Sequence, residues 1–471
     1  MKEKTYGIVC AVLLGLGQMC MYTGYDTQGF IVEPLLHSVH DRSPRRIDSH
    51  AGYYGAAVCC IVYTFANLVA PWFLGIFGSK LTLVLGSVTY TLYFLSFLYV
   101  HYIPFYLTSA LIGLGFSLYY IGNAGYVTEH STRNTIERNS ALVWGLGTSC
   151  MIVGGIVLLF TTKPPTTTAT SELVSTNHTN STLYHSKLYD DDGTVKSYRK
   201  YSDFEIRVMF GAFALVAFVS NVIFALLPSR PVENSLAKSG GNEREILGFV
   251  EQLRKMFAAL AHPKMLKLAP SFCVVGSTTS FWTYVYPTAL VFTKKLSGLV
   301  YLPAYYSIVL GTGDLLMGLV ISYLSKRIPN FGQKPTQLIG FLTFFTGICL
   351  VLVSTPAMTL ALINAFLFGM ADNCFNTSRT VLAAIVLPGK RSQVFSISKF
   401  YQALTIGILM FTSPLLSMPM HCAIVGINLI LSLYLFNKVA NETKRFEKKI
   451  AQEASSVWTI LQKDEKNHTA L

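Results

Sequence analysis

The sequence predicts an all-α integral membrane protein with twelve transmembrane helices. Of its 471 residues, 52% are hydrophobic and only 13% are charged, against about 25% charged in an average soluble domain. The apolar residues gather in twelve blocks, each close to the roughly 20 residues that an α-helix needs to cross hydrocarbon. A water-soluble fold is therefore excluded, and helices are the expected elements.

The predicted helices follow one another along the chain, separated by short polar connections and two longer hydrophilic segments. The first six are expected at Tyr6 to Tyr25, Gly52 to Phe77, Leu81 to Val100, Phe105 to Val127, Ala141 to Phe160 and Val208 to Leu227. The last six are expected at Leu268 to Phe292, Leu302 to Leu324, Thr336 to Val353, Met358 to Val386, Val394 to Leu416 and Met418 to Phe436.

A hydrophilic stretch of 45 residues, 162–206, separates the fifth predicted helix from the sixth and orients the chain. It contains two N-glycosylation sequons, which begin at Asn177 and Asn180. Such sequons are modified only on the lumenal or extracellular side of a membrane. With twelve crossings, this loop predicts a multi-pass protein whose N- and C-termini are both cytosolic.

The basic residues support the same orientation. Of the 37 Lys and Arg residues, 24 fall on the predicted inner side, 11 on the outer side, and two, Arg379 and Lys399, within or near helices. An excess of Lys and Arg on the cytosolic side is typical of membrane proteins. The net charge of +13 is thus mainly a topology signal that also attracts anionic lipid, and it does not imply a nucleic-acid partner.

The predicted helices divide into two halves of six, residues 1–227 and 268–437. A cytosolic linker, 228–267, joins the halves, and a cytosolic tail, 438–471, follows the second. The linker contains a basic amphipathic segment, Glu243 to Phe257.

Faint internal similarity indicates that the two halves arose by duplication. Gly113-Leu114-Gly115 and Arg138-Asn139-Ser140 in the first half correspond to Gly369-Met370-Ala371 and Arg391-Ser392-Gln393 in the second. A six-plus-six repeat is the architecture of major facilitators, whose halves rock about a site near the middle of the membrane. We therefore expect a fold of the major-facilitator type.

Asp314 is one of two main candidates for an intramembrane site. It lies midway along Leu302 to Leu324, and its side chain is too short to reach the interface. An unpaired Asp at this depth costs about 2.5 to 3.5 kcal/mol on insertion. We therefore expect Asp314 to face protein or water.

The predicted helix Met358 to Val386 carries the densest polar feature. It contains Asp372, Asn373 and Asn376, followed by Arg379. The spacing of Asp372, Asn376 and Arg379 at i, i+4 and i+7 places these three residues on one helical stripe.

Two interpretations of these polar residues remain open. In the functional one, Asp314 and Asp372 are the anionic groups of an ion, proton or solute path, with Arg379 or Lys399 as their partner. In the structural one, the same groups are interhelical hydrogen bonds and an ion pair that hold the bundle together. Arg379 and Lys399 can also mark the inner interface, which long basic side chains reach by snorkelling.

The sequence predicts no enzyme. It contains no phosphate-cradling glycine loop, no Cys and His residues at metal-binding spacing, and no nucleophile with an assignable base. We therefore expect no cofactor and no metal, and the lipid bilayer is the partner that the composition implies. Nothing in the sequence predicts an oligomeric state.

Several short polar segments together carry a resemblance to a known family. They are Asn67 with Pro71, Gly122-Asn123, Thr135 to Ser140 with its Arg138 and Asn139, Gly311 to Asp314, and Gly369 to Thr377 followed by Phe400-Tyr401-Gln402. They resemble the signatures of the Unc-ninety-three-like family, a branch of the major facilitator superfamily also called the ion channel regulatory protein family. The likeness covers most of the membrane portion, and Gly369 to Thr377 is its most specific part.

The resemblance implies a transporter-type fold whose characterised relatives act as partners of other membrane proteins. One is a regulatory subunit of a muscle potassium channel, and another escorts nucleic-acid-sensing Toll-like receptors to endosomes. Ordinary major facilitators also carry an acidic and basic latch after their second helix. Here the corresponding loop, Gly75 to Leu81, lacks the Asp and the final Arg of that latch.

Two functions are therefore carried forward. The first, which the resemblance favours, is a regulatory or trafficking partner of a potassium channel or a receptor. The second is a secondary transporter of a small ion or organic solute by alternating access, with Asp314 and Asp372 at its site.

Overall fold

The computed structural model describes residues 3–132, 135–162, 188–189, 195–196, 199–233, 235, 248–328, 333–353, 356–386 and 391–468. Helices dominate the described residues, and ten of them are long and apolar enough to cross a membrane. The expected all-α membrane protein is therefore confirmed. The predicted glycosylation sites, Asn177 and Asn180, lie outside the described residues.

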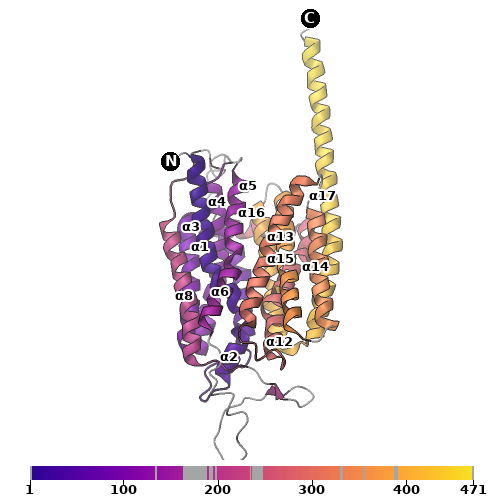
Figure 1. Ribbon diagram of the computed structural model, residues 1–471. Helices are drawn as coiled ribbons and strands as arrows, with labels where there is room; N and C mark the ends of the chain where they lie inside the picture. The colour runs from indigo at the N-terminus through magenta and orange to yellow at the C-terminus, as the bar shows by residue number, and fades with distance from the viewer. Residues whose placement is uncertain are drawn as a thin grey trace, which may run out of the picture.

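The first part of the chain forms one side of the bundle in Figure 1. Its helices are α1 (Glu3–Gln28), α2 (Val32–His40), α3 (Ala51–Leu95) with a 3-10 turn (Ser96–Tyr99), α4 (Tyr102–Glu129), α5 (Ile136–Thr148), α6 (Cys150–Thr161) and α8 (Asp203–Leu226). Two short strands, β1 (Leu188–Tyr189) and β2 (Val195–Lys196), pair antiparallel before α8.

The second part forms the other side of the bundle. Its helices are α10 (Phe249–Leu260), α11 (Pro263–Ser280), a π-helical turn (Phe281–Val285), α12 (Tyr286–Phe292), α13 (Leu302–Arg327), α14 (Gln333–Val353), α15 (Met358–Val386), α16 (Arg391–Thr412) with a 3-10 turn (Ser413–Leu415), and α17 (Met418–His468). Both chain ends lie at the same end of the bundle, the termini side, opposite the loop side that carries α2, β1 and β2 (Figure 1).

The chain reverses within α3, at Gly78. This glycine has φ 69° and ψ 170°, a backbone region that is open essentially to glycine alone. Contacts between α3 and α4 show the reversal. Before Gly78, the numbers of the contacting residues in the two helices increase together, so the segments run parallel. After Gly78 they change in opposite directions, so the segments run antiparallel. The contacting pairs are Gly55 with Phe105, Cys59 with Gly113, Leu83 with Gly122, and Gly86 with Gly115. The two arms of α3 therefore correspond to two of the predicted helices, Gly52 to Phe77 and Leu81 to Val100.

Several helix boundaries differ from those predicted. The predicted helix Ala141 to Phe160 is interrupted at Ser149, between α5 and α6, and Leu268 to Phe292 contains the π-helical turn. The last helix continues to His468, well beyond the predicted end at Phe436, because a helix that leaves hydrocarbon continues as long as its polar residues favour helix. The nine-residue α2 was not predicted, since it lies in a segment too short to cross a membrane.

Two helix pairs join the halves through small residues. At the α6–α13 pair, the Cα of Gly155 approaches the carbonyl of Ala304, and Gly311 approaches Met151 so closely that a side chain on either glycine would collide. At the α3–α16 pair, Gly407 packs beside Cys60. Small residues allow helices in a membrane to approach closely without a hydrophobic driving force.

Aromatic side chains close the bundle on the loop side. Phe30, just after α1, packs on Tyr306 of α13 with ring centroids 5.1 Å apart. The hydroxyl of Tyr284 donates to that of Tyr25 at 3.4 Å, and the hydroxyls of Thr27 and Ser307 lie 3.4 Å apart. The halves are therefore in contact at this end.

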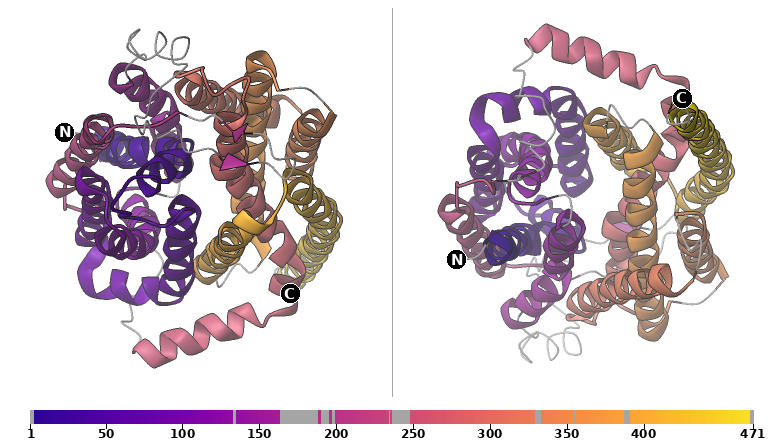
Figure 2. Two further views of the ribbon diagram at one scale, coloured as in Figure 1. Left: turned by 90° about the horizontal axis from the view of Figure 1, so that it is seen from below. Right: turned by 90° about the horizontal axis from the view of Figure 1, so that it is seen from above.

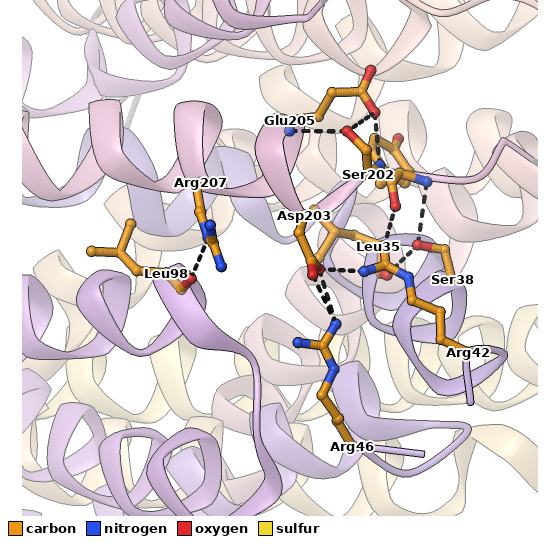
Figure 3. Close-up of polar contacts among 10 residues, drawn as sticks. Leu35, Ser38, Arg42, Arg46, Leu98, Ser202, Asp203, Glu205 and Arg207 are labelled. Atoms are coloured by element: carbon orange, nitrogen blue, oxygen red, sulfur yellow. Dashed lines mark hydrogen bonds and ion pairs between the residues drawn. The ribbon is translucent and has the colours of Figure 1, made fainter. Parts of the chain in front are cut away.

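A polar network holds α2 and the segment after it to the start of α8 (Figure 3). Arg42 and Arg46 both bind the carboxylate of Asp203, Arg46 at 3.0 Å. The backbone N–H of Tyr201 donates to the hydroxyl of Ser38 at 3.3 Å. Ser202 caps α8 in a reciprocal capping box with Glu205, which satisfies backbone donors at the helix start.

We expect Gly78→Ala to destabilise the protein by about 1 to 3 kcal/mol, because alanine is strained at this backbone conformation. Gly75→Ala is the matched control. A side chain at either position meets nothing within 4 Å, so only the backbone conformation distinguishes the two substitutions. Thermal unfolding of the purified protein measures the difference, and equal melting temperatures for the two variants would contradict the reversal at Gly78.

Candidate functional site

A cluster of polar side chains lies in the interior of the bundle and begins with Asp314 on α13. This side chain is 4% exposed, and its Oδ1 accepts a hydrogen bond from Asn373 Nδ2 of α15 at 2.8 Å. The two helices cross at glycines. A Cβ on Gly369 would lie 2.0 Å from the carbonyl oxygen of Leu310, and one on Gly313 would lie 2.4 Å from that of Phe366. The close crossing places the Asp314 carboxyl within reach of α15.

The predicted stripe on α15 forms a continuous chain of hydrogen bonds. Asn376 Nδ2 donates to Asp372 Oδ2 at 2.8 Å, and Asn376 Oδ1 accepts from Arg379 Nη2 at 2.8 Å. Arg379 Nη1 donates to Gln402 Oε1 of α16 at 2.5 Å. The Asn376 amide therefore bridges an acid and a base that lie seven residues apart on one helix.

Both basic candidates lie inside the protein. Arg379 is 4% exposed and Lys399 is 3% exposed, so neither snorkels to the interface. Lys399 Nζ lies 3.9 Å from the centroid of the Tyr120 ring on α4, a cation–π contact that is strongest where water is excluded. Through Tyr120, the first half of the protein contacts the charged groups of the second.

The structure adds an acid that sequence reasoning missed. Asp26, on α1, accepts a hydrogen bond from Cys150 Sγ of α6 at 3.4 Å and interacts electrostatically with Asp372 and Asp314. It directly follows the predicted helix end at Tyr25 and so lies outside the predicted helix. The apolar and aromatic residues from Phe30 to Leu36 are the signal that the buried segment continues past it.

The cluster carries more acids than bases. Asp26, Asp314 and Asp372 face Arg379 and Lys399. Asp314, Arg379 and Lys399 are buried, whereas Asp26 and Asp372 are partly buried. A buried charge must be paired, or it is neutralised by a proton. The cluster has one acid more than it has bases.

A second buried acid that sequence reasoning missed lies near the loop side. Glu33 of α2 is 2% exposed, and it accepts hydrogen bonds from the backbone N–H of Tyr53 at 3.1 Å and from His50 Nδ1 at 3.2 Å. Its carboxylate thus caps the start of α3, where the helix dipole favours negative charge. The hydrogen bond to Glu33 raises the pKa of His50, against the effect of burial.

The remaining motif residues do not join the interior cluster. Asn67 donates to the carbonyl of Tyr63 in its own helix, and Asn123 donates to the hydroxyl of Tyr119. Arg138 donates to Asn139, whose Nδ2 donates to Ser131 at 2.9 Å. Arg138 and Asn139 therefore organise the α4–α5 connection on the termini side.

One apolar cavity lies away from the acids. A cavity of about 440 Å³ opens on the outside of the bundle between α13 and α15, with an apolar lining that includes Val309, Met358 and Phe366. In the described part of the chain, no group of three or more His, Cys, Asp or Glu residues is placed to hold a metal ion.

Residues 43–437 match the protein family described as ion channel regulatory protein UNC-93. The chain is also similar to the UNC93-like protein MFSD11 of Xenopus laevis, with 23% identity over 447 residues that cover 88% of this chain and 91% of the frog protein. The MFSD11 protein of Xenopus tropicalis is similar to the same extent.

Solved transporter structures share the fold. A peptide transporter, POT, in complex with sulfate superposes with a TM-score of 0.63 at 13% identity, covering 93% of this chain and 94% of its own. The xylose transporter XylE from E. coli, in a partially occluded inward-open conformation, gives a TM-score of 0.59 at 14% identity, covering 93% of this chain and 98% of its own. At such low identity the likeness shows the fold alone, which is that of the major facilitators.

We expect Asn376→Leu to destabilise the protein more than its neighbour Thr377→Val. Both substitutions keep the approximate shape and remove polar atoms. Asn376 bonds two charged groups, each such bond contributing about 1.5 to 3 kcal/mol, whereas Thr377 makes one neutral bond to Asn373, at 3.3 Å, worth about 0.5 to 1.5 kcal/mol. Thermal unfolding in detergent measures both, and an equal loss would contradict the bridging role of Asn376.

Proposed function

The chain belongs to the UNC-93 family of ion channel regulatory proteins, and from this membership we propose that it is a regulatory or trafficking partner of a membrane client. The client is an ion channel, with a potassium channel as the first candidate, or a receptor. In this function the transporter-type fold presents its helices and loops to the client and moves no solute.

The observation that carries this proposal is the family match over residues 43–437, and the internal pairing of the polar groups agrees with it. The carboxyls of Asp314 and Asp372 are hydrogen-bonded by amides of α15. Toward the loop side, the enclosed pocket lined by Tyr25, Tyr93 and Tyr284 has no room for a water molecule. The loop side is therefore closed in this conformation, and the apolar cavity between α13 and α15 opens on the outside of the bundle, a surface that this function assigns to the client.

A secondary transporter is the second candidate function, and the charge imbalance of the interior cluster favours it. Three acids and two bases, contributed by helices of both halves, leave one acid to be neutralised by a proton or cation. The neighbouring folds belong to proteins named as peptide and xylose transporters. In this function Asp314, Asp372, Asn373, Asn376 and Arg379 form the site, and closure of the loop side is one state of an alternating cycle.

We further propose twelve crossings in a six-plus-six arrangement. Ten helices have the length and composition to cross a membrane. One of them, α3, reverses at Gly78 and therefore counts as two crossings. The segment from α11 to α12 is long enough to form one more. Residues 1–227 and 268–437 then form the two halves, with 228–267 as linker and 438–471 as tail.

The same arrangement places both termini in the cytosol and the loop that carries Asn177 and Asn180 outside or in the lumen. We expect a mass shift on deglycosylation of the wild-type protein that the double variant Asn177→Gln, Asn180→Gln abolishes. The sequon Asn467-His468-Thr469 in the tail is an internal control that stays unmodified. Glycan at Asn467, or none at the two loop sites in a glycosylating cell, would contradict this topology.

The two functions predict different effects of Asp314→Asn, with Thr312→Val, on the same helix, as the matched control. A regulatory partner carrying Asp314→Asn loses association with its client, measured by proximity labelling in cells, because the group that accepts the hydrogen bond from Asn373 loses its carboxylate. In liposomes, neither variant nor wild type shows ion or solute flux.

The opposite result supports the transporter. Flux that is present in the wild type and in Thr312→Val, and that Asp314→Asn abolishes at an unchanged surface level, would overturn the partner proposal.

A further inference from the structure

The helix α10 lies outside the ring of membrane-crossing helices. Viewed along the bundle axis, it runs across the edge of the molecule and projects beyond the outline of the other helices (Figure 2, pink). A helix in this position covers no part of the bundle's own end. Lipid surrounds a membrane protein beside this helix and below it, on the side toward the middle of the bundle.

The depth of α10 places it at the level of lipid headgroups. Phe249 packs on Trp72 with ring centroids 5.4 Å apart, and Met256 and Ala259 pack with Ile397 of α16. Trp72 lies six residues before the turn at Gly78, and Ile397 lies six residues after the start of α16 at Arg391. At about 1.5 Å per residue, these contacts lie about 9 Å inside the helix ends.

The apolar face of α10 is wider than the surface the protein covers. Met256 and Ala259 are fully buried against the bundle. Farther around the helix, beyond the partly buried Leu253 and Leu260, are Val250, 77% exposed, and Phe257, 54% exposed. These two are seven residues apart and therefore lie on one line of the helix. In water, these two side chains would form an exposed apolar stripe.

The opposite face of α10 is charged. Arg254, Lys255 and Glu251 are exposed on the described helix, and two positive charges against one negative leave this face basic. An amphipathic helix with apolar side chains on one face and basic residues on the other lies in the interfacial plane of a membrane, and anionic lipid strengthens its binding.

We propose that α10 is a lipid-binding helix that lies in the headgroup region of the leaflet on the termini side. Val250 and Phe257 enter the acyl boundary, and Arg254 and Lys255 bind the anionic headgroups of lipids such as phosphatidylserine. The proposal holds for either function of the interior cluster. The proposed topology makes this leaflet the cytosolic one, which is where anionic lipid is concentrated.

This position also ties lipid binding to the contact between the halves. The helix packs on Leu68 of α3 in the first half and on Ile397 and Phe400 of α16 in the second. Any rocking of one half against the other on the termini side must therefore move α10 relative to at least one of these helices. Anionic lipid that holds α10 in place stabilises the arrangement of the halves seen here.

Hydrogen exchange of the full-length protein tests the proposal. Residues 249–260 are followed in nanodiscs of phosphatidylcholine alone and with increasing phosphatidylserine. We expect slower exchange as phosphatidylserine is added. The double variant Arg254→Gln, Lys255→Gln should weaken the binding of α10 to anionic lipid about 30-fold, so that added phosphatidylserine no longer slows exchange, since each basic residue near the surface contributes about 1 kcal/mol.

Matched variants separate lipid binding from misfolding. Glu251→Gln, on the same charged face, should keep or strengthen the response, and Val250→Gln with Phe257→Gln should weaken protection in both kinds of nanodisc. Protection that is independent of phosphatidylserine and of both basic residues would overturn the proposal. So would protection in detergent that rises with protein concentration, because a second copy of the chain would then cover the helix.

Discussion

The structure depends on one constraint, which is that a charge surrounded by hydrocarbon must find its partners within the protein. Hydrating water is absent at that depth, and an unpaired acid costs about 2.5 to 3.5 kcal/mol even on the mildest scales. Asp314, Asp372, Arg379 and Lys399 therefore fix which helices face one another. Each turns toward the interior, and together they require α13, α15, α16 and α4 to meet there.

Glycine makes this meeting possible. The polar side chains of α13 and α15 are short, so the helix backbones must come close before an Asn amide reaches an Asp carboxyl. Gly313 and Gly369 provide the crossing at which Asp314 and Asn373 bond. A similar close approach joins the halves at Gly155. At the α13–α15 crossing the small residues thus set the distance between the backbones, and the amides donate hydrogen bonds to the acids.

Sequence alone predicted the features that depend on local periodicity. The apolar blocks predicted the membrane helices, and the i, i+4, i+7 spacing predicted the stripe of Asp372, Asn376 and Arg379. It missed features that depend on where distant segments meet. Asp26 joins the cluster because α1 packs along α6, and Glu33 is buried because it caps a helix that begins 18 residues later. Neither contact leaves a periodic signal in the sequence, and the functional role of the whole cluster stays a prediction.

A double-mutant cycle on Asp372 and Arg379 tests the central claim most directly, which is that the buried acids and bases stabilise the bundle as a connected set. The stability of wild type, Asp372→Asn, Arg379→Gln and the double variant is measured by unfolding of the purified protein. The account predicts that the double variant loses less than the two single variants together, with a coupling free energy of about 1 to 3 kcal/mol. Additive losses would contradict it, because they would mean that each charge is held independently of the other.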